Sequence, residues 1–308
     1  MNTAVTADSQ SPWRTLPGEY AIPEHPPTLA EAREYCRRLA RTHYENFSVA
    51  TWFLPRHLRQ HFYNVYAYCR ISDDLGDETN NPAASLQLLS EWEDELDACY
   101  TGHSRHPVFV ALSETIKQFD IPKRPFADLL KAFRQDQTVT RYPTFNDLLG
   151  YCENSANPVG RLVLYVCGYR DPERQALSDF TCTALQLANF WQDVSADWNK
   201  GRIYVPLEDL RRFGVSEQDI AESRNSEPFR EMMKFEVKRA REWFRQGLPL
   251  IKSVDRSLAL DIELFSRGGQ EILNAIEAQG FVVLGRRPSI SRRRKLYLAA
   301  GAALRNML

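Results

Sequence analysis

The spacing of apolar side chains constrains the fold of this chain more than any other feature. From residue 29 onward they recur every three or four residues, as in amphipathic helices, and no useful stretch alternates as a strand does. The expected helices span residues 29–44, 55–78, 84–100, 107–119, 126–136, 141–155, 161–166, 173–197, 207–213, 227–247, 255–278 and 289–306. Glycine supplies only 14 of 308 residues, a deficit that favours helices over turn-rich β structure. The sequence therefore predicts an all-α protein.

Residues 1–28 differ from the rest of the chain. They are polar and contain five prolines, so we expect an extended N-terminal arm. Thr28, followed by Glu31 three residues later, is typical of a helix N-cap. The composition does not change beyond this point. We therefore predict one helical domain over residues 29–308, with an extended loop at 200–206.

Charge and cysteine usage exclude several classes of protein. The chain has 39 Lys and Arg against 40 Asp and Glu, and a net charge of −1 argues against a nucleic-acid partner. We find no signal peptide, and the longest apolar stretches fall far short of the roughly 20 residues that span a bilayer. The six cysteines form no C-x-x-C pair and show no metal-ligand spacing. These features predict a reduced, cytoplasmic protein.

Two of the expected helices carry paired carboxylates on one face. At about 100° per residue, Asp73 and Asp77 share a face with Tyr66, with Arg70 beside them and Asp74 to one side. In the helix at 173–197, four polar side chains share a face in the same way: Gln186, Asn189, Asp193 and Asp197. Each helix thus presents two carboxylates one turn apart in mainly apolar surroundings.

Paired carboxylates on a half-buried face repel each other and need a compensating cation. Mg²⁺ suits them, because it takes oxygen ligands, keeps waters and is usually completed by substrate phosphates. Two such faces opposed across a cavity would hold a diphosphate, and Arg70, Lys200 and Arg202 would neutralise its charge as it leaves. A single pair is most often a solvated helix face, but two matched pairs favour a site for metal and diphosphate.

Other metal and nucleotide sites lack support in the sequence. None of the six histidines has a glutamate three residues before it, as a di-iron carboxylate bundle requires. The spacing of an EF-hand loop is absent, and so are the glycine-rich strings of dinucleotide and P-loop sites.

Three smaller features have simple structural interpretations. His57 and His61 are one turn apart, and we expect surface or capping groups rather than metal ligands. Trp191 is expected to pack in the core. The C-terminal segment joins a basic run at 292–295 to an apolar stretch, which is typical either of an ordinary terminal helix or of contact with anionic lipid.

The sequence resembles the squalene/phytoene synthase family over about residues 30–300. The strings LPRHLRQHFYNVYAYCRISDDLGDE (54–78) and ALQLANFWQDVSADWNKGRIYVP (184–206) resemble its two signature motifs, and YCENSANPVGRL (151–162) resembles its middle segment. ENF at 45–47 and SANPVG at 155–160 are most similar to the bacterial hydroxysqualene synthase branch. The resemblance implies an isoprenoid-synthase helical fold with the active site in a central cavity.

The resemblance also implies roles for individual residues. Mg²⁺, in more than one ion, would be held by Asp73, Asp74, Asp77, Asn189, Asp193 and Asp197. Catalytic roles would fall to Tyr66, Arg70, Gln186 and Asn189. Substrate contacts would come from Tyr44, Asn46, Arg70, Ala156, Val159, Gly160, Gln186, Lys200, Arg202, Tyr204 and Arg267. Among these, Ala156, Val159 and Gly160 would leave room for a prenyl chain.

Departures from the family's pattern bear on the choice of reaction. Tyr44 and Asn46 stand where many head-to-head synthases carry a serine pair, and Arg267, Gly268 and Gly269 stand where relatives carry an Arg-x-Tyr pattern. Loss of a bulky phenol beside the substrate would admit water. Glycine inside a helix costs about 1 kcal/mol relative to alanine, which points to a steric or functional reason for these two.

These features favour an enzyme that converts presqualene diphosphate and water to hydroxysqualene and diphosphate, in bacterial squalene and hopanoid biosynthesis. In this reaction the loss of diphosphate leaves a carbocation. Because water rather than hydride captures this carbocation, no NAD(P)H is required. The main alternative is a synthase that condenses two farnesyl or geranylgeranyl diphosphates head to head, and a catalytically silent helical binding protein is the second. Because the substrate is hydrophobic, we further expect peripheral contact of the protein with the inner face of the membrane. We also expect a presqualene diphosphate synthase to hand over the substrate.

Overall fold

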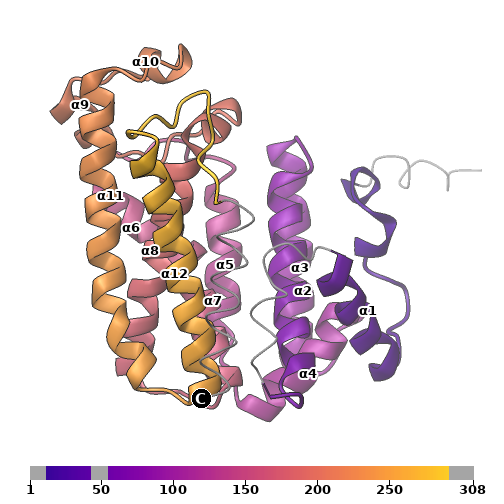
Figure 1. The fold of residues 1–308 in the computed structure, drawn as a ribbon. Helices are drawn as coiled ribbons and strands as arrows, with labels where there is room; N and C mark the ends of the chain where they lie inside the picture. Colours follow the sequence, from indigo (N-terminus) through magenta and orange to yellow (C-terminus); the bar gives the residue numbers. More distant parts are fainter. Residues whose placement is uncertain (1–11, 43–54, 291–308) are drawn as a thin grey trace, which may run out of the picture. The chain divides into compact units, whose positions relative to one another are not determined.

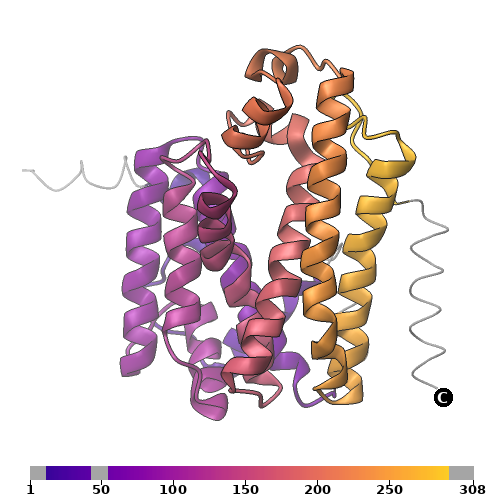
Figure 2. The ribbon, with the colours of Figure 1, turned by 90° about the vertical axis from the view of Figure 1, so that its left-hand side faces the viewer.

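The computed structural model describes residues 12–42 and 55–290 of the 308-residue chain. Regular structure within these ranges is helical, apart from one isolated bridge between Arg141 and Ile203. The predicted all-α class is therefore confirmed. Backbone contacts divide the described residues into two compact units, the first holding 12–42 and 57–138 and the second holding 55–56 and 139–290. Figures 1 and 2 show the helices of each unit from two sides.

The first unit contains the predicted N-terminal helices and part of the N-terminal arm. Its long helices are α1 (Leu29–Thr42), α2 (Arg59–Asp77), α3 (Pro82–Thr101), α4 (Pro107–Phe119) and α5 (Arg124–Gln135). Within the arm that was expected to be extended, residues 12–20 contain two short 3-10 helices, η2 (Pro12–Thr15) and η3 (Gly18–Tyr20). The expected cap of α1 is confirmed, because the Thr28 and Glu31 side chains accept hydrogen bonds from each other's backbone N–H groups.

The second unit is built around the longest helix of the described chain. Its elements are α6 (Phe145–Ser155), α7 (Asn157–Val166), α8 (Pro172–Asn199), α9 (Leu207–Phe213), α10 (Glu217–Ala221), α11 (Glu227–Gly247), η4 (Leu248–Lys252) and α12 (Arg256–Ala278). The five-residue α10 was not anticipated, because it is too short to show an apolar period. The break before α7 falls at Ala156, two residues before Pro158, since a proline is tolerated in the first turn of a new helix. Nearly all of the helix expected at 289–306 lies outside the described residues.

Aromatic packing and a buried polar network fix α2 in the first unit. Tyr68 of α2 lies edge-on to Phe109 and Phe126 and stacks on Trp92, and all four side chains are fully buried. The Tyr68 hydroxyl donates to the carbonyl of Phe126 at 2.8 Å. This core holds the middle of α2, just before its acidic end.

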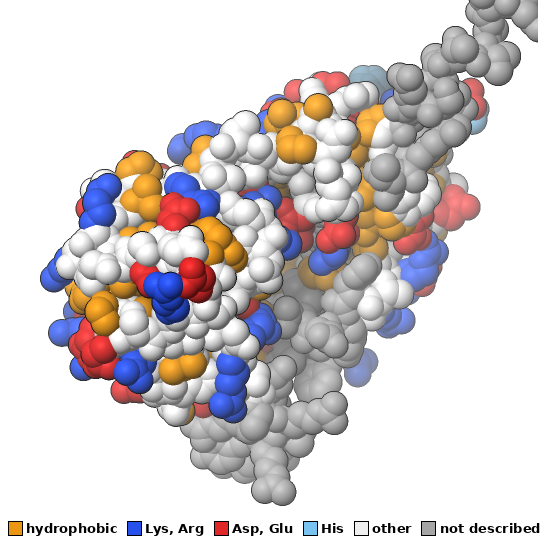
Figure 3. All heavy atoms as spheres, turned by 90° about the horizontal axis from the view of Figure 1, so that it is seen from above, with side chains coloured by type: hydrophobic (Ala, Val, Ile, Leu, Met, Phe, Trp, Pro, Cys, Tyr) orange, Lys and Arg blue, Asp and Glu red, His pale blue; other side chains and the backbone are white. Residues whose placement is uncertain are grey.

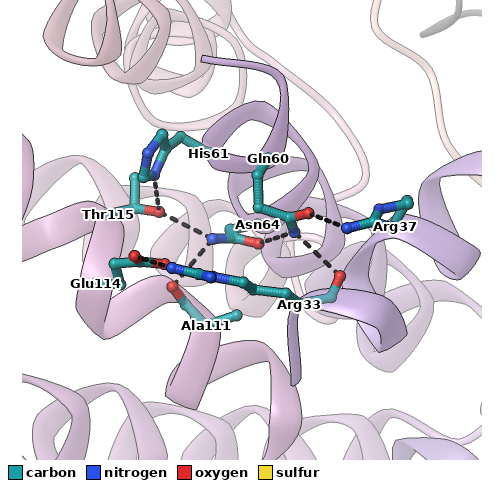
Figure 4. A network of polar contacts seen from close by, with 8 residues as sticks. All are labelled: Arg33, Arg37, Gln60, His61, Asn64, Ala111, Glu114 and Thr115. Carbon is teal, nitrogen blue, oxygen red and sulfur yellow. Dashed lines mark hydrogen bonds and ion pairs between the residues drawn. The ribbon is translucent and has the colours of Figure 1, made fainter. Parts of the chain in front are cut away.

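The polar network holds the beginning of α2 (Figure 4). The buried amide of Asn64 donates to the Ala111 carbonyl and to the Thr115 hydroxyl, each at 3.0 Å, and accepts from Gln60 at 2.9 Å. Every polar group of Asn64 shown there is satisfied, which removes the penalty of burying it. His61 bonds to the same Thr115 hydroxyl at 3.0 Å.

The expectation that His61 is a surface or capping group is therefore wrong. Its side chain is buried within α2, whereas His57 is exposed and precedes the helix. Burial lowers the pKa of the His61 imidazole.

Close backbone approach positions α8 against its neighbours in the second unit. A Cβ atom added at Gly160 of α7 would collide with Ser178 and Cys182 of α8, and one at Gly247 of α11 would meet Thr181. Glycine at these positions lets the helices pack within a distance that any side chain would prevent. Trp191 of α8 is fully buried, which confirms its expected place in the core.

All six cysteines are free thiols. Within residues 12–42 and 55–290, none of the helices is both long and apolar enough to cross a membrane. Acidic and basic side chains are interspersed over the face shown in Figure 3, in keeping with the near-zero net charge.

Candidate functional site

We name the acidic end of α2 the first aspartate motif (Arg70, Asp73, Asp74 and Asp77). Its carboxylates differ in how deeply they are buried. The Asp73 side chain is 52% exposed, whereas that of Asp74 is only 6% exposed. Asp77 is half-buried. The helical spacing thus turns Asp73 to the surface and Asp74 into the protein, as their 100° separation requires.

Arg70 is bound to Asp74 rather than directed away from it. Its Nε donates to Asp74 Oδ2 at 3.0 Å and its Nη2 bonds to Asp74 Oδ1, while Nη1 lies 3.9 Å from Asp73 Oδ2. The Tyr20 hydroxyl of η3 also donates to Asp74 Oδ2, at 2.7 Å. Asp74, predicted as a metal ligand, is engaged by these three bonds in the structure. Tyr66, one turn before Arg70, is half-buried, and desolvation raises the pKa of its phenol.

The second aspartate motif (Gln186, Asn189, Asp193 and Asp197 of α8) contains a break in the helix. Asp193 has φ −108° and ψ 15°, outside the helical range, although the helix continues to Asn199. Asn189 is exposed, and Gln186 and Asp197 are half-buried. The sequence signalled the helix face but not this distortion.

Arg287, from the segment after α12, forms an ion pair with Asp193. Its Nη2 donates to Asp193 Oδ2 at 2.9 Å and its Nε bonds to Oδ1. Next to it, Gln192 donates to the Pro288 carbonyl at 2.7 Å, and the Gly285 N–H donates to Ser195 Oγ at 3.0 Å. Residues 285–288, which we name the C-terminal strap, are therefore fastened along α8 at the motif. The pKa of Arg287 is raised, first by its hydrogen bond to Asp193.

The loop after the second motif supplies three of the predicted contacts. The Arg202 N–H donates to the Asp197 carbonyl at 2.8 Å, so the loop folds back on the end of α8. Lys200 is exposed and Arg202 is half-buried. The Tyr204 ring is buried and stacks on Phe190 with centroids 4.0 Å apart, which gives it a clear packing role.

The small residues of the middle segment behave differently from one another. Ala156 is buried at the break between α6 and α7, whereas Val159 is 39% exposed. Gly160 faces Ser178 and Cys182, so its lack of a side chain serves the packing of α7 on α8.

The two adjacent glycines of α12, Gly268 and Gly269, also differ in their surroundings. A Cβ atom added at Gly269 would lie 2.5 Å from Phe244 Cζ and 2.8 Å from Leu185 Cδ2, whereas one at Gly268 meets nothing within 4 Å. Gly269 therefore has a steric reason to be glycine. Arg267 is paired with Glu263 at 2.6 Å. The remaining predicted substrate contacts, Tyr44 and Asn46, lie outside the described residues.

Comparison with known proteins decides the family. The model of the squalene/phytoene synthase family matches residues 40–294. The chain belongs to this family. It is 30% identical over 295 residues to the phytoene synthase of Arthrospira platensis, covering 91% of this chain and 95% of that protein. It is 31% identical over 292 residues to the 15-cis-phytoene synthase of Synechocystis, covering 90% and 86%.

Two solved structures of the family share its fold. The squalene synthase HpnC from Alicyclobacillus acidocaldarius is 45% identical, with a TM-score of 0.79 over 88% of this chain and 98% of that one. A dehydrosqualene synthase in complex with ligand is 26% identical, with a TM-score of 0.82 over 91% and 98%. The fold is therefore the all-helical isoprenoid-synthase fold. The predicted central cavity and the single domain over 29–308 remain predictions.

Members of the family use prenyl diphosphates and typically require Mg²⁺. Among the residues that the structure describes, no three His, Cys, Asp or Glu side chains gather closely enough to hold a metal ion. Mg²⁺ does not need such a cage, because it is usually held by one or two carboxylates together with waters and substrate phosphates. Pairs of carboxylates one turn apart fit that requirement; the Asp73 side chain is 52% exposed, and that of Asp193 is 25% exposed and carries Arg287 on both oxygens.

Sequence reasoning missed two residues that contact the aspartate motifs. Tyr20 lies in a proline-rich arm with no helical period, and Arg287 lies in an irregular segment beyond the last described helix. Neither position carries a spacing signal. A tyrosine or arginine can be placed beside a carboxylate far away in the sequence only by the tertiary fold.

Proposed function

We propose that the protein is an Mg²⁺-dependent enzyme that converts presqualene diphosphate and water to hydroxysqualene and diphosphate. One observation carries the choice of squalene over carotenoid biosynthesis: the identity to squalene synthase HpnC, 45%, is well above that to the phytoene synthases, about 30%. We infer from this difference that the chain acts in squalene biosynthesis rather than in carotenoid biosynthesis.

The carboxylates of each motif would hold Mg²⁺ and, through it, diphosphate. Asp73 and Asp77 take this role on α2, and Asp193 and Asp197 take it on α8. Bound Mg²⁺ supplies positive charge that stabilises the departing diphosphate. Arg70, Lys200 and Arg202 add further positive charge, and Gln186 orients the diphosphate by hydrogen bonds.

The reaction itself needs no nucleophile from the protein. The carbon–oxygen bond to the diphosphate breaks, and its electron pair leaves with the diphosphate. The cyclopropylcarbinyl cation that remains rearranges, and the oxygen of a water molecule forms the new bond and releases a proton. The candidates that we propose for positioning this water are Tyr66 of α2, Asn189 of α8, or Tyr44, which lies outside the described residues. No reductant enters the balance, so no NAD(P)H is required.

Product analysis tests this proposal. The purified full chain is incubated with Mg²⁺ and either presqualene diphosphate or farnesyl diphosphate, and products are identified by gas chromatography and mass spectrometry. We expect hydroxysqualene from presqualene diphosphate and no product from farnesyl diphosphate. Squalene or another C30 hydrocarbon from farnesyl diphosphate would refute the water-capture reaction.

The second candidate is a head-to-head condensing synthase. Its support is the match to phytoene synthases at about 30% identity over nearly the whole chain. This function predicts phytoene from geranylgeranyl diphosphate or a C30 hydrocarbon from farnesyl diphosphate, so the same assay separates the two. We further propose that a presqualene diphosphate synthase supplies the substrate at a membrane surface, because both substrate and product are hydrophobic.

A further inference from the structure

The N-terminal segment of residues 12–28 is docked on the first unit through several specific contacts. Trp13 Nε1 donates to Glu91 of α3 at 2.6 Å, and Tyr35 of α1 donates through its hydroxyl to the Glu19 carbonyl at 2.8 Å. Leu16 is 8% exposed and Tyr20 only 2%. Figure 1 shows this indigo segment beside α1. The segment is thus a built part of the unit.

Tyr20 is the one residue among these docking contacts that bonds to the first aspartate motif. Its hydroxyl donates to Asp74 Oδ2 at 2.7 Å, and the same oxygen accepts from Arg70 Nε at 3.0 Å. Arg70 Nη2 bonds to the second oxygen, Oδ1. Three donors therefore surround a carboxylate that is almost completely buried, and they fix its plane.

Fixing this carboxylate also fixes the guanidinium. Arg70 uses Nε and Nη2 on Asp74 in a two-point contact, so the plane of Asp74 sets the plane of Arg70. The third nitrogen, Nη1, then lies 3.9 Å from Asp73 Oδ2. Tyr20 thereby determines, through Asp74, where the positive charge of Arg70 stands beside Asp73.

We propose that Tyr20 is a positioning residue for Mg²⁺ and diphosphate at the first aspartate motif, acting through Asp74 and Arg70. This inference rests on the proposed function only in so far as both require the motif to bind diphosphate with its metal. Tyr20 donates to Asp74 and would act through it. A phenol suits the role, because it is a neutral hydrogen-bond donor at physiological pH.

The test measures the binding of inorganic diphosphate with Mg²⁺ by isothermal titration calorimetry on the full chain. Tyr20→Phe removes one hydroxyl and keeps the buried ring, and residues that orient a metal site from outside its ligands typically contribute about 10-fold or more to affinity. We expect the dissociation constant to rise by about 10-fold. The matched control is Tyr35→Phe, which removes the hydroxyl that holds the same segment at Glu19 but does not contact Asp74. It should bind as the unaltered protein does.

A second pair of variants tests the route of the effect. Arg70→Lys cannot make the two-point contact, so adding Tyr20→Phe to it should change affinity no further. An equal loss in Tyr35→Phe would show that only docking of the segment matters. Unchanged binding in Tyr20→Phe, the same loss with and without Arg70→Lys, or no binding of Mg²⁺ and diphosphate by the unaltered chain would each overturn the inference.

These outcomes are distinct from failure of the proposed reaction. If no hydroxysqualene forms but Tyr20→Phe weakens the binding of diphosphate, the positioning role stands and the proposed function falls. If hydroxysqualene forms and Tyr20→Phe binds normally, the reverse holds.

Discussion

The two aspartate motifs carry similar residues but differ in what holds them. In the first, the arginine of the same helix pairs with the buried Asp74 and leaves Asp73 at the surface. In the second, an arginine from the C-terminal strap pairs with Asp193, a predicted metal ligand, where α8 is distorted. In the first motif the two-point contact of the arginine is with Asp74, and its Nη1 lies 3.9 Å from the predicted ligand Asp73, whereas in the second motif the two-point contact is with the predicted ligand Asp193 itself. Two pairs of aspartates with the same spacing in sequence can therefore differ in how accessible they are to a metal ion.

The largest expected effect tests whether both motifs serve the reaction in spite of this difference. Asp73→Ala and Asp193→Ala should each lower formation of hydroxysqualene by at least about 10²–10³-fold, because charge on the leaving diphosphate would lose its stabilisation. Initial rates with presqualene diphosphate measure this effect. Asp94→Ala and Glu173→Ala, at exposed acidic positions of α3 and α8, are the controls. Full activity in either motif variant would show that its motif is not needed for the reaction.

Two buried titratable groups give the units opposite responses to pH. Burial raises the pKa of Asp261 in α12 from 3.8 to about 8, and neither oxygen has a hydrogen-bond partner. The folded state therefore binds a proton on Asp261 more tightly than the unfolded chain does. As a result, the free energy of unfolding falls as pH rises from 3.8 to about 8. In the first unit, burial lowers the pKa of His106 from 6.5 to about 3. Here the unfolded chain binds the proton more tightly, and the free energy of unfolding falls as pH drops below about 6.5.

Urea unfolding from pH 4 to pH 8 separates the two contributions. Asp261→Asn should remove the decrease in unfolding free energy toward high pH, which is on the order of a few kcal/mol. His106→Asn keeps a capping side chain for α4 and should remove the decrease toward low pH. A parallel shift of both variants across the whole range would show that neither group titrates on unfolding.

The surroundings of the motifs also differ in their tolerance of a methyl group. Gly269→Ala, in the helix packed on α8, forces Phe244 and Leu185 to move and should cost about 1–3 kcal/mol of unfolding free energy. Gly76→Ala, between Asp74 and Asp77 of α2, meets Phe133 Cβ only at an ordinary 3.4 Å. It should be neutral or stabilise by up to about 1 kcal/mol, as should Gly268→Ala in open space. Equal costs at Gly76 and Gly269 would contradict this contrast.

The helices and the faces of both motifs could be predicted because they depend on local spacing. Asp73 and Asp77, like Asp193 and Asp197, are four residues apart, and helical geometry alone puts each pair on one face. The partners could not be predicted, because Tyr20 and Asp74 are 54 residues apart and Arg287 and Asp193 are 94 apart. The glycine pair shows the same limit. Two adjacent glycines inside a helix indicated a steric or functional constraint. Only the position of Phe244 in the structure shows that Gly269 is the constrained glycine.

The smallest expected effect concerns the cation on the second motif. Arg287 occupies both oxygens of Asp193, so a divalent ion that binds there in the absence of diphosphate must displace it. An exposed ion pair contributes up to about 1 kcal/mol, so Arg287→Gln should tighten Mn²⁺ binding by no more than about 5-fold, as measured by paramagnetic resonance titration. Arg286→Gln, its exposed neighbour, should leave the affinity unchanged. Arg70→Gln should tighten binding less than Arg287→Gln does, because the Arg70 contact to Asp73 is 3.9 Å long and its two-point contact is with Asp74. Equal tightening by the two arginine variants would mean that both motifs compete with the metal in the same way, and the contrast between them would fail.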